Sequence, residues 1–193
     1  MTQPTAIAHT SMTDAPQSRH DLRKILLQKR RNLDASLKQQ WDAELGQKLQ
    51  AYCAHHQITS LGVYWPIKGE PDLRDAYGTL AAAGMQLALP LIETRQQPLV
   101  FLDWKPGDPM LDDEYGIPVP AQRSVTILPA ALIIPCVGFN AQNFRLGYGG
   151  GYYDRTLEKL PRPLTLGIAY QCTLADFAAG EHDIAMDDIL IAG

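Results

Sequence analysis

The segment from Asn143 to Asp154, NFRLGYGGGYYD, holds the residues best suited to chemistry. Its glycines are Gly147, Gly149, Gly150 and Gly151, and they stand between Arg145 and the sequence Tyr152-Tyr153-Asp154. A glycine-rich turn can direct several backbone N–H groups at one anion, because no Cβ blocks close approach. Arg145 adds a guanidinium fork suited to phosphate oxygens, and Asp154 adds a hard oxygen suited to Mg²⁺. The segment therefore predicts a loop that binds a triphosphate with its magnesium.

Two common phosphate-binding motifs do not fit this spacing. A dinucleotide fingerprint, G-x-G-x-x-G, counted from Gly147 would place Tyr152 at its last glycine. A P-loop requires a lysine after its second glycine, and no such lysine follows. A plain flexible turn is the remaining alternative. The arginine, tyrosines and aspartate around the glycines favour an anion site over that turn.

The flanking segments must position this loop. Leu132–Val137 is apolar and predicts a buried strand, whereas Tyr152–Leu160 predicts a short helix. The positive end of that helix dipole would point at a bound anion.

The rest of the chain alternates between helical and strand patterns. Leucines recur on one face of a helix that begins at Arg19, with Arg19, Arg23 and Arg30 along one edge of that face. Asp34 is the expected N-cap of a second helix. Strands are expected at Ser60–Pro66, Met85–Leu91, Leu99–Trp104 (antiparallel), Thr165–Tyr170 and the C-terminus, with a helix at about 72–83. This alternation predicts an α/β protein, a three-layer α/β/α domain with a mostly parallel, mixed central sheet.

Length and composition set the remaining expectations. The 193 residues suit one domain at 19–193, after a polar, aperiodic leader at 1–18 that we expect to be disordered. A net charge of −4 argues against nucleic acid as a partner. The cysteines Cys53, Cys136 and Cys172 are widely spaced, which favours a reducing cytoplasm. No apolar run reaches the roughly 18–20 residues of a membrane span, and no signal peptide is visible, so a cytoplasmic location without membrane partners is expected.

The segment Arg145–Asp154 matches R-L-G-x-G-x-G-Y-Y-D at every fixed position. In this it resembles the 5-formyltetrahydrofolate cyclo-ligases, also called 5,10-methenyltetrahydrofolate synthetases, and the similarity extends over most of residues 19–193. The resemblance implies ATP-dependent cyclisation of 5-formyltetrahydrofolate to 5,10-methenyltetrahydrofolate, with release of ADP and phosphate. It also implies Mg²⁺ as cofactor, small-molecule substrates, and a monomer or weak homodimer.

The resemblance further implies a role for individual residues. Arg145 and Tyr152 would act in catalysis. The nucleotide would contact Arg19 and Arg23, at the family's K/R-x-x-x-R spacing, and the loop residues Arg145, Leu146, Gly147, Tyr148, Gly149, Gly150, Gly151, Tyr152 and Tyr153. The folate would contact Trp65, Glu70, Tyr115, Tyr148, Gly149, Gly150, Gly151 and Tyr152, and Asp154 and Asp187 would hold the metal. Glu70 suits a pterin, whose 2-amino group and ring N–H can donate to both oxygens of one carboxylate.

Three positions depart from the family pattern. Gly150 stands where many relatives have lysine or arginine, and Ala130 and Asn140 stand where aspartates are common. These departures keep open a non-catalytic nucleotide- or folate-binding relative. A phosphosugar isomerase-like enzyme, which would use an anion loop without ATP, is a further alternative.

Overall fold

The computed structural model describes residues 18–193, and its centre is a six-stranded sheet. The strands lie in the order β10-β9-β6-β1-β2-β3. Their bounds are β1 Ser60–Gly62, β2 Gln86–Leu91, β3 Val100–Trp104, β6 Ala131–Pro135, β9 Leu164–Tyr170 and β10 Asp188–Ala192. All neighbours pair in parallel except β3, which is antiparallel to β2. The predicted mixed, mostly parallel sheet is confirmed.

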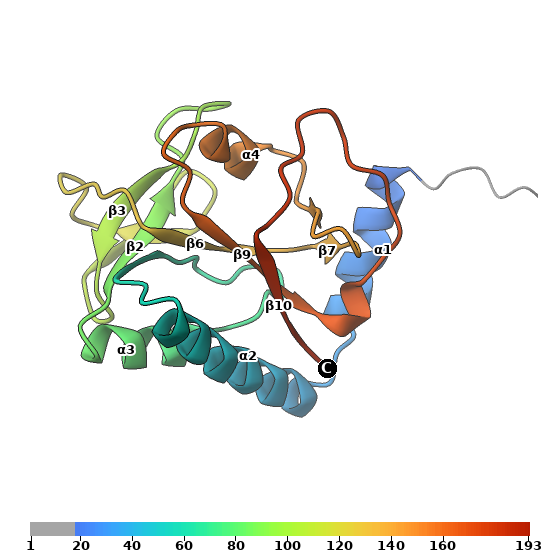
Figure 1. Cartoon of the computed structure of the whole chain (residues 1–193), viewed down its shortest axis with the longest axis horizontal. Coiled ribbons are helices and arrows are strands. Elements are labelled where there is room, and N and C mark those ends of the chain that lie inside the picture. The colour runs from blue at the N-terminus through green and yellow to red at the C-terminus, as the bar shows by residue number, and fades with distance from the viewer. Residues whose placement is uncertain (1–17) are drawn as a thin grey trace, which may run out of the picture.

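Helices cover both faces of the sheet (Figure 1). Their bounds are α1 Arg19–Arg31, α2 Ala35–His55, α3 Arg74–Ala82 and α4 Tyr152–Leu157, with a 3₁₀ turn at Gln171–Thr173. The helices α2 and α3 lie along one face, α4 lies over the other, and α1 stands beside β7, beyond the end of β6 (Figure 1). This arrangement is the expected three-layer architecture.

The core lies on both sides of the central strands. Successive strand residues point to opposite faces, so Ile133 packs with Leu45 and Leu49 of α2, whereas Leu132 and Ile134 pack in a second cluster with Leu157 of α4. Burial on both faces explains why these strands read as continuous apolar runs. It also leaves the carboxyl ends of the strands as the edge from which loops can form a site.

Two short hairpins differ from the expected loops. The strands β7 (Gly138–Phe139) and β8 (Arg145–Leu146) pair with each other, so a hairpin intervenes between β6 and the glycine segment. The glycine segment therefore follows this hairpin, whereas the sequence predicts that it follows the buried strand directly. A second hairpin joins β4 (Met110–Asp112) to β5 (Pro118–Pro120).

Several predicted boundaries also shift. The first strand ends at Gly62 rather than Pro66, and the helix after the glycines ends at Leu157 rather than Leu160. The expected leader falls outside the described residues except for Ser18, whose hydroxyl accepts from the N–H of Asp21 and caps α1. The predicted N-cap of α2 is confirmed, because Asp34 accepts from the N–H groups of Ser36 and Leu37.

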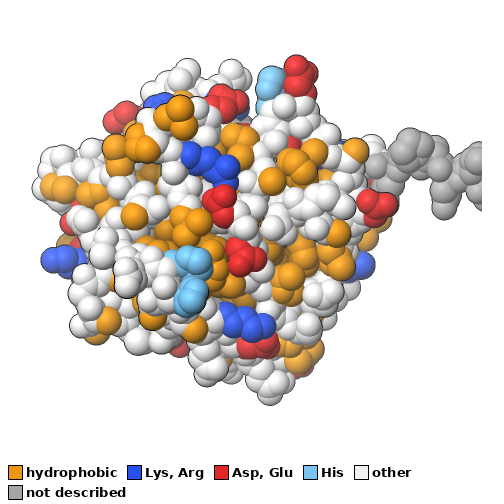
Figure 2. Space-filling view, viewed as in Figure 1, with side chains coloured by type: hydrophobic (Ala, Val, Ile, Leu, Met, Phe, Trp, Pro, Cys, Tyr) orange, Lys and Arg blue, Asp and Glu red, His pale blue; other side chains and the backbone are white. Residues whose placement is uncertain are grey.

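On the face drawn in Figure 2, lysine and arginine side chains lie singly among acidic and apolar ones. Within residues 18–193, every helix is too short or too polar to cross a membrane.

Close packing at β1 gives a test of the fold. A Cβ added at Gly62 would collide with Leu132 and Phe101, so Gly62→Ala should lower the free energy of unfolding by about 2 kcal/mol. Gly78, inside α3, has open space around its Cα, so Gly78→Ala should raise stability by up to about 1 kcal/mol. Urea unfolding of both variants measures whether their stabilities change in opposite directions. Equal changes in the free energy of unfolding would contradict the close packing at β1.

Candidate active site

A cavity of about 960 Å³ opens at the carboxyl ends of β1, β2 and β6. Its walls come from α1, the turn after β1, the β4–β5 hairpin, the glycine segment with α4, and the segment around Asp183. All the predicted site residues line it except Leu146 and Asp187. Leu146 is fully buried in β8 and packs with α1 instead.

The glycine segment is held open by its backbone conformation and by two arginines. Gly149 and Gly151 have φ of 97° and 64°, which a residue with a Cβ rarely adopts. Arg23 Nε donates to the carbonyl oxygen of Gly147 at 2.8 Å, and Arg155 Nη2 donates to that of Gly150 at 2.6 Å. No described residue accepts a hydrogen bond from the N–H groups of Gly149, Gly150 or Gly151. These amides are therefore available to an anion in the cavity.

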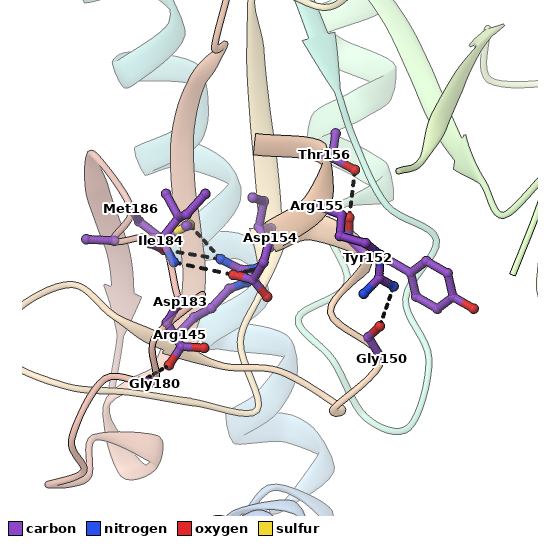
Figure 3. A network of polar contacts seen from close by, with 12 residues as sticks. Arg145, Gly150, Tyr152, Asp154, Arg155, Thr156, Gly180, Asp183, Ile184 and Met186 are labelled. Carbon is purple, nitrogen blue, oxygen red and sulfur yellow. Dashed lines mark hydrogen bonds and ion pairs between the residues drawn. The ribbon is translucent and has the colours of Figure 1, made fainter. Parts of the chain in front are cut away.

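Arg145 lies beneath this loop and is paired within the protein. Its side chain is 5% exposed, and Nη2 donates to Asp154 Oδ1 at 2.8 Å (Figure 3). Its Nη1 also donates to the carbonyl oxygen of Ile184 at 3.4 Å. The guanidinium is thus paired with Asp154, and its main role in the cavity is to orient that carboxylate. Among residues 18–193, no group donates to the other oxygen of Asp154, Oδ2.

The first helix supplies two arginines to the cavity. Arg19 Nη2 donates to Asp183 Oδ2 at 2.6 Å, and Arg23 reaches the glycine loop. Burial, with a smaller contribution from the charge of Arg19, lowers the pKa of Arg23. An arginine keeps its charge despite such a shift. Arg23 therefore stands in the cavity as a cation that has no direct carboxylate partner among the described residues.

Asp183, and not Asp187, lines the cavity together with Asp154. We had expected Asp187 beside Asp154, but its carboxylate accepts from Arg162, at 2.8 Å, and from the N–H and hydroxyl of Thr165. Asp183 lines the cavity instead. Burial alone would raise the pKa of Asp183, but the hydrogen bonds from Arg19 and the N–H of Gly180 outweigh it and lower that pKa. Asp183 is thus held as a carboxylate.

Glu70 also lines the cavity and is 3% exposed. Its Oε2 accepts from the N–H of Ile67 at 2.9 Å, and its Oε1 accepts from the hydroxyl of Tyr148 at 2.8 Å. It follows a turn in which Lys68 and Gly69 have φ of 49° and 75°. Burial raises the pKa of Glu70 above its usual range, and the hydrogen bonds from Ile67 and Tyr148 act against that rise.

Aromatic side chains form the rest of the wall. Trp65 lines the cavity and also meets Trp104 edge-on, so it is both a wall and a core contact. Tyr115, at the tip of the β4–β5 hairpin, is 47% exposed, and the neighbouring Tyr152 and Glu114 raise its pKa to about 12. The guanidinium carbon of Arg155 lies 5.1 Å from the ring centre of Tyr152 (Figure 3). Tyr153 lies over Arg145, and burial raises its pKa.

Three further residues of the site were not singled out in the sequence. Arg30 lies on the expected arginine edge of α1 but is 2% exposed and turned inward, toward Tyr148. Asp183 lies four residues before Asp187, and nothing in the local sequence distinguishes the two aspartates as metal ligands. Arg155 follows Asp154 directly, and only the fold of the loop brings it to Gly150.

These features define a class of protein. Loop amides, the guanidinium of Arg23 and several carboxylates lie in one cavity at the carboxyl edge of a mostly parallel sheet, together with a buried glutamate and aromatic walls. Such a site suits a phosphorylated small molecule beside a flat heterocycle. Within the described part of the chain, no group of three or more His, Cys, Asp or Glu side chains could hold a metal by itself.

Comparison with known proteins places the chain within that class. Residues 15–192 match the model of the 5-formyltetrahydrofolate cyclo-ligase family, and the chain belongs to this family. It is 30% identical to the 5-formyltetrahydrofolate cyclo-ligase of Haemophilus influenzae over 183 residues, covering 91% of this chain and 96% of that protein. It is 32% identical to the Mycoplasma pneumoniae enzyme of that name over 174 residues, covering 88% and 95%.

Solved structures agree with this assignment. A 5,10-methenyltetrahydrofolate synthetase from Mycoplasma pneumoniae superposes with a TM-score of 0.75 at 31% identity, over 90% of this chain and 98% of that one. The 5,10-methenyltetrahydrofolate synthetase of Aquifex aeolicus gives a TM-score of 0.77 at 26% identity, over 90% and 89%. The family expected from the residues Arg145–Asp154 is confirmed.

Proposed function

We propose that this protein converts 5-formyltetrahydrofolate to 5,10-methenyltetrahydrofolate, consuming ATP and releasing ADP and phosphate. The observation that carries the proposal is that the glycine loop with its arginines and the buried Glu70 face the same cavity. The names of the relatives support the substrate and product. We further propose a cytoplasmic enzyme that acts on small molecules only, which the three free cysteines and the net charge of −4 support.

The triphosphate would lie against the glycine loop. The amides of Gly149, Gly150 and Gly151 would donate to its oxygens, and Arg23 would supply charge that no carboxylate in contact with it cancels. Arg155 stands at the far end of the loop and can add a second guanidinium. These two arginines offset the absence of a basic side chain at Gly150.

The reduced pterin would lie against Glu70. The carboxylate is fixed by Ile67 and Tyr148, and each of its oxygens retains a lone pair for a donor from the ligand. Trp65 and Tyr115 offer aromatic surface for the ring and its substituents. The two substrates would then meet near Tyr152.

The chemistry requires positioning more than a protein nucleophile. The N5-formyl oxygen attacks the γ-phosphorus of ATP, and ADP leaves. The formyl carbon is then attacked by N10, the C–O bond breaks with release of phosphate, and N10 loses its proton. A poor leaving group, the amide oxygen, has become a good one. The residues contribute by aligning the formyl oxygen with the γ-phosphorus and by keeping water out.

Magnesium fits the acidic pair of this cavity better than the pair Asp154 and Asp187. Asp154 Oδ2 and Asp183 Oδ1 accept no hydrogen bond from the described residues, so both remain available to a cation. Mg²⁺ keeps several waters and uses few protein carboxylates, so the lack of a larger cluster does not conflict with it. When bound, the ion neutralises charge on the phosphates.

The acidic pair gives a prediction about magnesium. Asp154→Asn and Asp183→Asn should each raise the Mg²⁺ concentration needed for half-maximal rate by about tenfold, because a carboxylate ligand is lost. Asp187→Asn removes the same charge outside the cavity and should leave the titration unchanged. A shift in Asp187→Asn alone would return the metal site to Asp187 and contradict our assignment of Asp183.

A direct assay tests the proposed function. The purified protein is mixed with 5-formyltetrahydrofolate, with and without Mg-ATP, and the absorbance of the methenyl product is followed. We expect product only with Mg-ATP, at one ADP per turnover. Binding of both ligands without product would support the non-catalytic alternative, and turnover without ATP would contradict the proposed mechanism.

A further inference from the structure

Tyr148 belongs to the glycine loop and also contacts Glu70. Its backbone belongs to the glycine loop, between Gly147, whose carbonyl oxygen accepts from Arg23, and Gly149, which has a φ of 97°. Its hydroxyl donates to Glu70 Oε1 at 2.8 Å. One side chain therefore joins the loop offered to the triphosphate to the carboxylate offered to the pterin.

Arg30 supports the contact between Tyr148 and Glu70 through hydrogen bonds of its guanidinium. Its Nη2 donates to the hydroxyl oxygen of Tyr148 at 2.7 Å and to the carbonyl oxygen of Lys68 at 3.0 Å, and its Nη1 donates to that of Cys136 at 3.2 Å. Arg30 is 2% exposed. The guanidinium thus connects α1, the turn that precedes Glu70, the end of β6 and the glycine loop.

The three groups must move together. The hydroxyl of Tyr148 gives its single hydrogen to Glu70 and accepts from Arg30. If Tyr148 turned away, a buried guanidinium N–H and a buried carboxylate oxygen would both lose a partner, which is costly inside a protein. The position of the glycine loop and the position of the carboxylate are consequently set by one chain of hydrogen bonds.

We propose that the chain Arg30–Tyr148–Glu70 couples the two substrate sites, so that the nucleotide and the reduced pterin each raise the affinity for the other. This inference rests on the proposed function, since it requires both ligands to use this cavity. A ligand that fixes the loop fixes Tyr148 and hence Glu70, and thermodynamic linkage requires the same factor in the reverse direction. Tyr148 carries the coupling, and Arg30 is a positioning residue that acts through Tyr148.

Calorimetric titration measures the coupling. The Kd of 5-formyltetrahydrofolate is determined with and without saturating Mg²⁺ and the non-hydrolysable β,γ-imido analogue of ATP. In the unaltered protein the analogue should tighten folate binding by about fivefold or more. In Tyr148→Phe, which keeps the ring and its contact with Lys68 but lacks the hydroxyl, this factor should fall to near one while each ligand still binds alone.

Two further variants separate coupling from structural damage. Arg30→Lys keeps the positive charge but cannot reach Lys68, Cys136 and Tyr148 with one planar fork, so its coupling factor should also fall. Tyr52→Phe removes a hydroxyl from α2, outside the cavity wall, and should retain the full factor. Thermal unfolding of each variant shows whether it is folded.

The outcomes are distinguishable. Loss of coupling in Tyr148→Phe and Arg30→Lys, with coupling retained in Tyr52→Phe, would support the inference. Equal weakening of both ligands in Tyr148→Phe with an unchanged coupling factor would overturn it, because the hydroxyl would then have a structural role only. Independent binding of the two ligands to the unaltered protein would also overturn it while leaving the proposed function intact. Failure of the unaltered protein to bind either ligand would overturn the proposed function itself.

Discussion

Arg145→Ala is expected to lower the turnover rate by about a hundredfold and the free energy of unfolding by about 3 kcal/mol. The side chain is 5% exposed and orients Asp154, so its removal leaves that carboxylate, which is 21% exposed, without its partner. The carbonyl oxygen of Ile184 loses a donor as well. Both losses loosen the surroundings of Asp154, the carboxylate expected to hold the metal. Initial rates and urea unfolding measure both effects.

A matched control distinguishes this buried pair from ordinary surface charge. Lys48 pairs with Glu44 on α2, where both side chains are nearly half exposed. Lys48→Ala should therefore change stability little and leave the rate unaltered. An Arg145→Ala protein with normal kinetics would remove the Arg145–Asp154 pair from the active site, whatever its stability.

Glu70→Gln is expected to weaken binding of 5-formyltetrahydrofolate by about 2 kcal/mol, roughly thirtyfold in Kd, while the Kd of the ATP analogue changes much less. The amide can replace only one of the two acceptor oxygens, so its NH₂ group would face a donor from the protein or the pterin. Glu158→Gln, at an exposed position on the cavity rim, is the control and should bind folate normally. A larger loss for the nucleotide than for the folate would contradict the assignment of Glu70.

The raised pKa of Glu70 adds a pH dependence with a definite sign. Protonated Glu70 cannot accept from both pterin donors, so folate affinity should fall as the pH drops through the raised pKa, at a higher pH than for an ordinary glutamate. Folding stability should change in the opposite direction, because protonation relieves the burial of the charge. In Glu70→Gln the affinity should not depend on pH in this range. Arg30, Lys68 and Tyr148 are the charged and titratable groups that surround the carboxylate.

The layered fold could be predicted because local patterns determine it. Apolar runs such as Leu132–Val137 identify strands buried on both faces, and the side chain of Asp34 identifies the start of a helix. The hairpin of β7 and β8 could not be predicted, since each strand has only two residues and depends on pairing rather than on propensity. The first strand also ends earlier than its β-forming sequence predicts, at Gly62.

The site was predictable where its residues are adjacent in sequence. The glycine segment could be read directly, because its glycines, arginine and aspartate lie within ten residues. Asp183 and Asp187 could not be ranked, because their difference arises from partners far along the chain, Arg19 for one and Arg162 for the other. Arg30 lies on the predicted arginine edge of the first helix, and only the folded structure shows that its guanidinium is buried behind the cavity wall, where it donates to Tyr148.

We expect one cavity to bind a triphosphate through main-chain amides beside a reduced pterin. A crystal structure with the β,γ-imido analogue of ATP, Mg²⁺ and 5-formyltetrahydrofolate tests it most directly. We expect phosphate oxygens within hydrogen-bonding distance of the amides of Gly149–Gly151 and of Arg23, and the pterin ring against Glu70. Phosphates bound elsewhere, with the glycine loop still free, would contradict it.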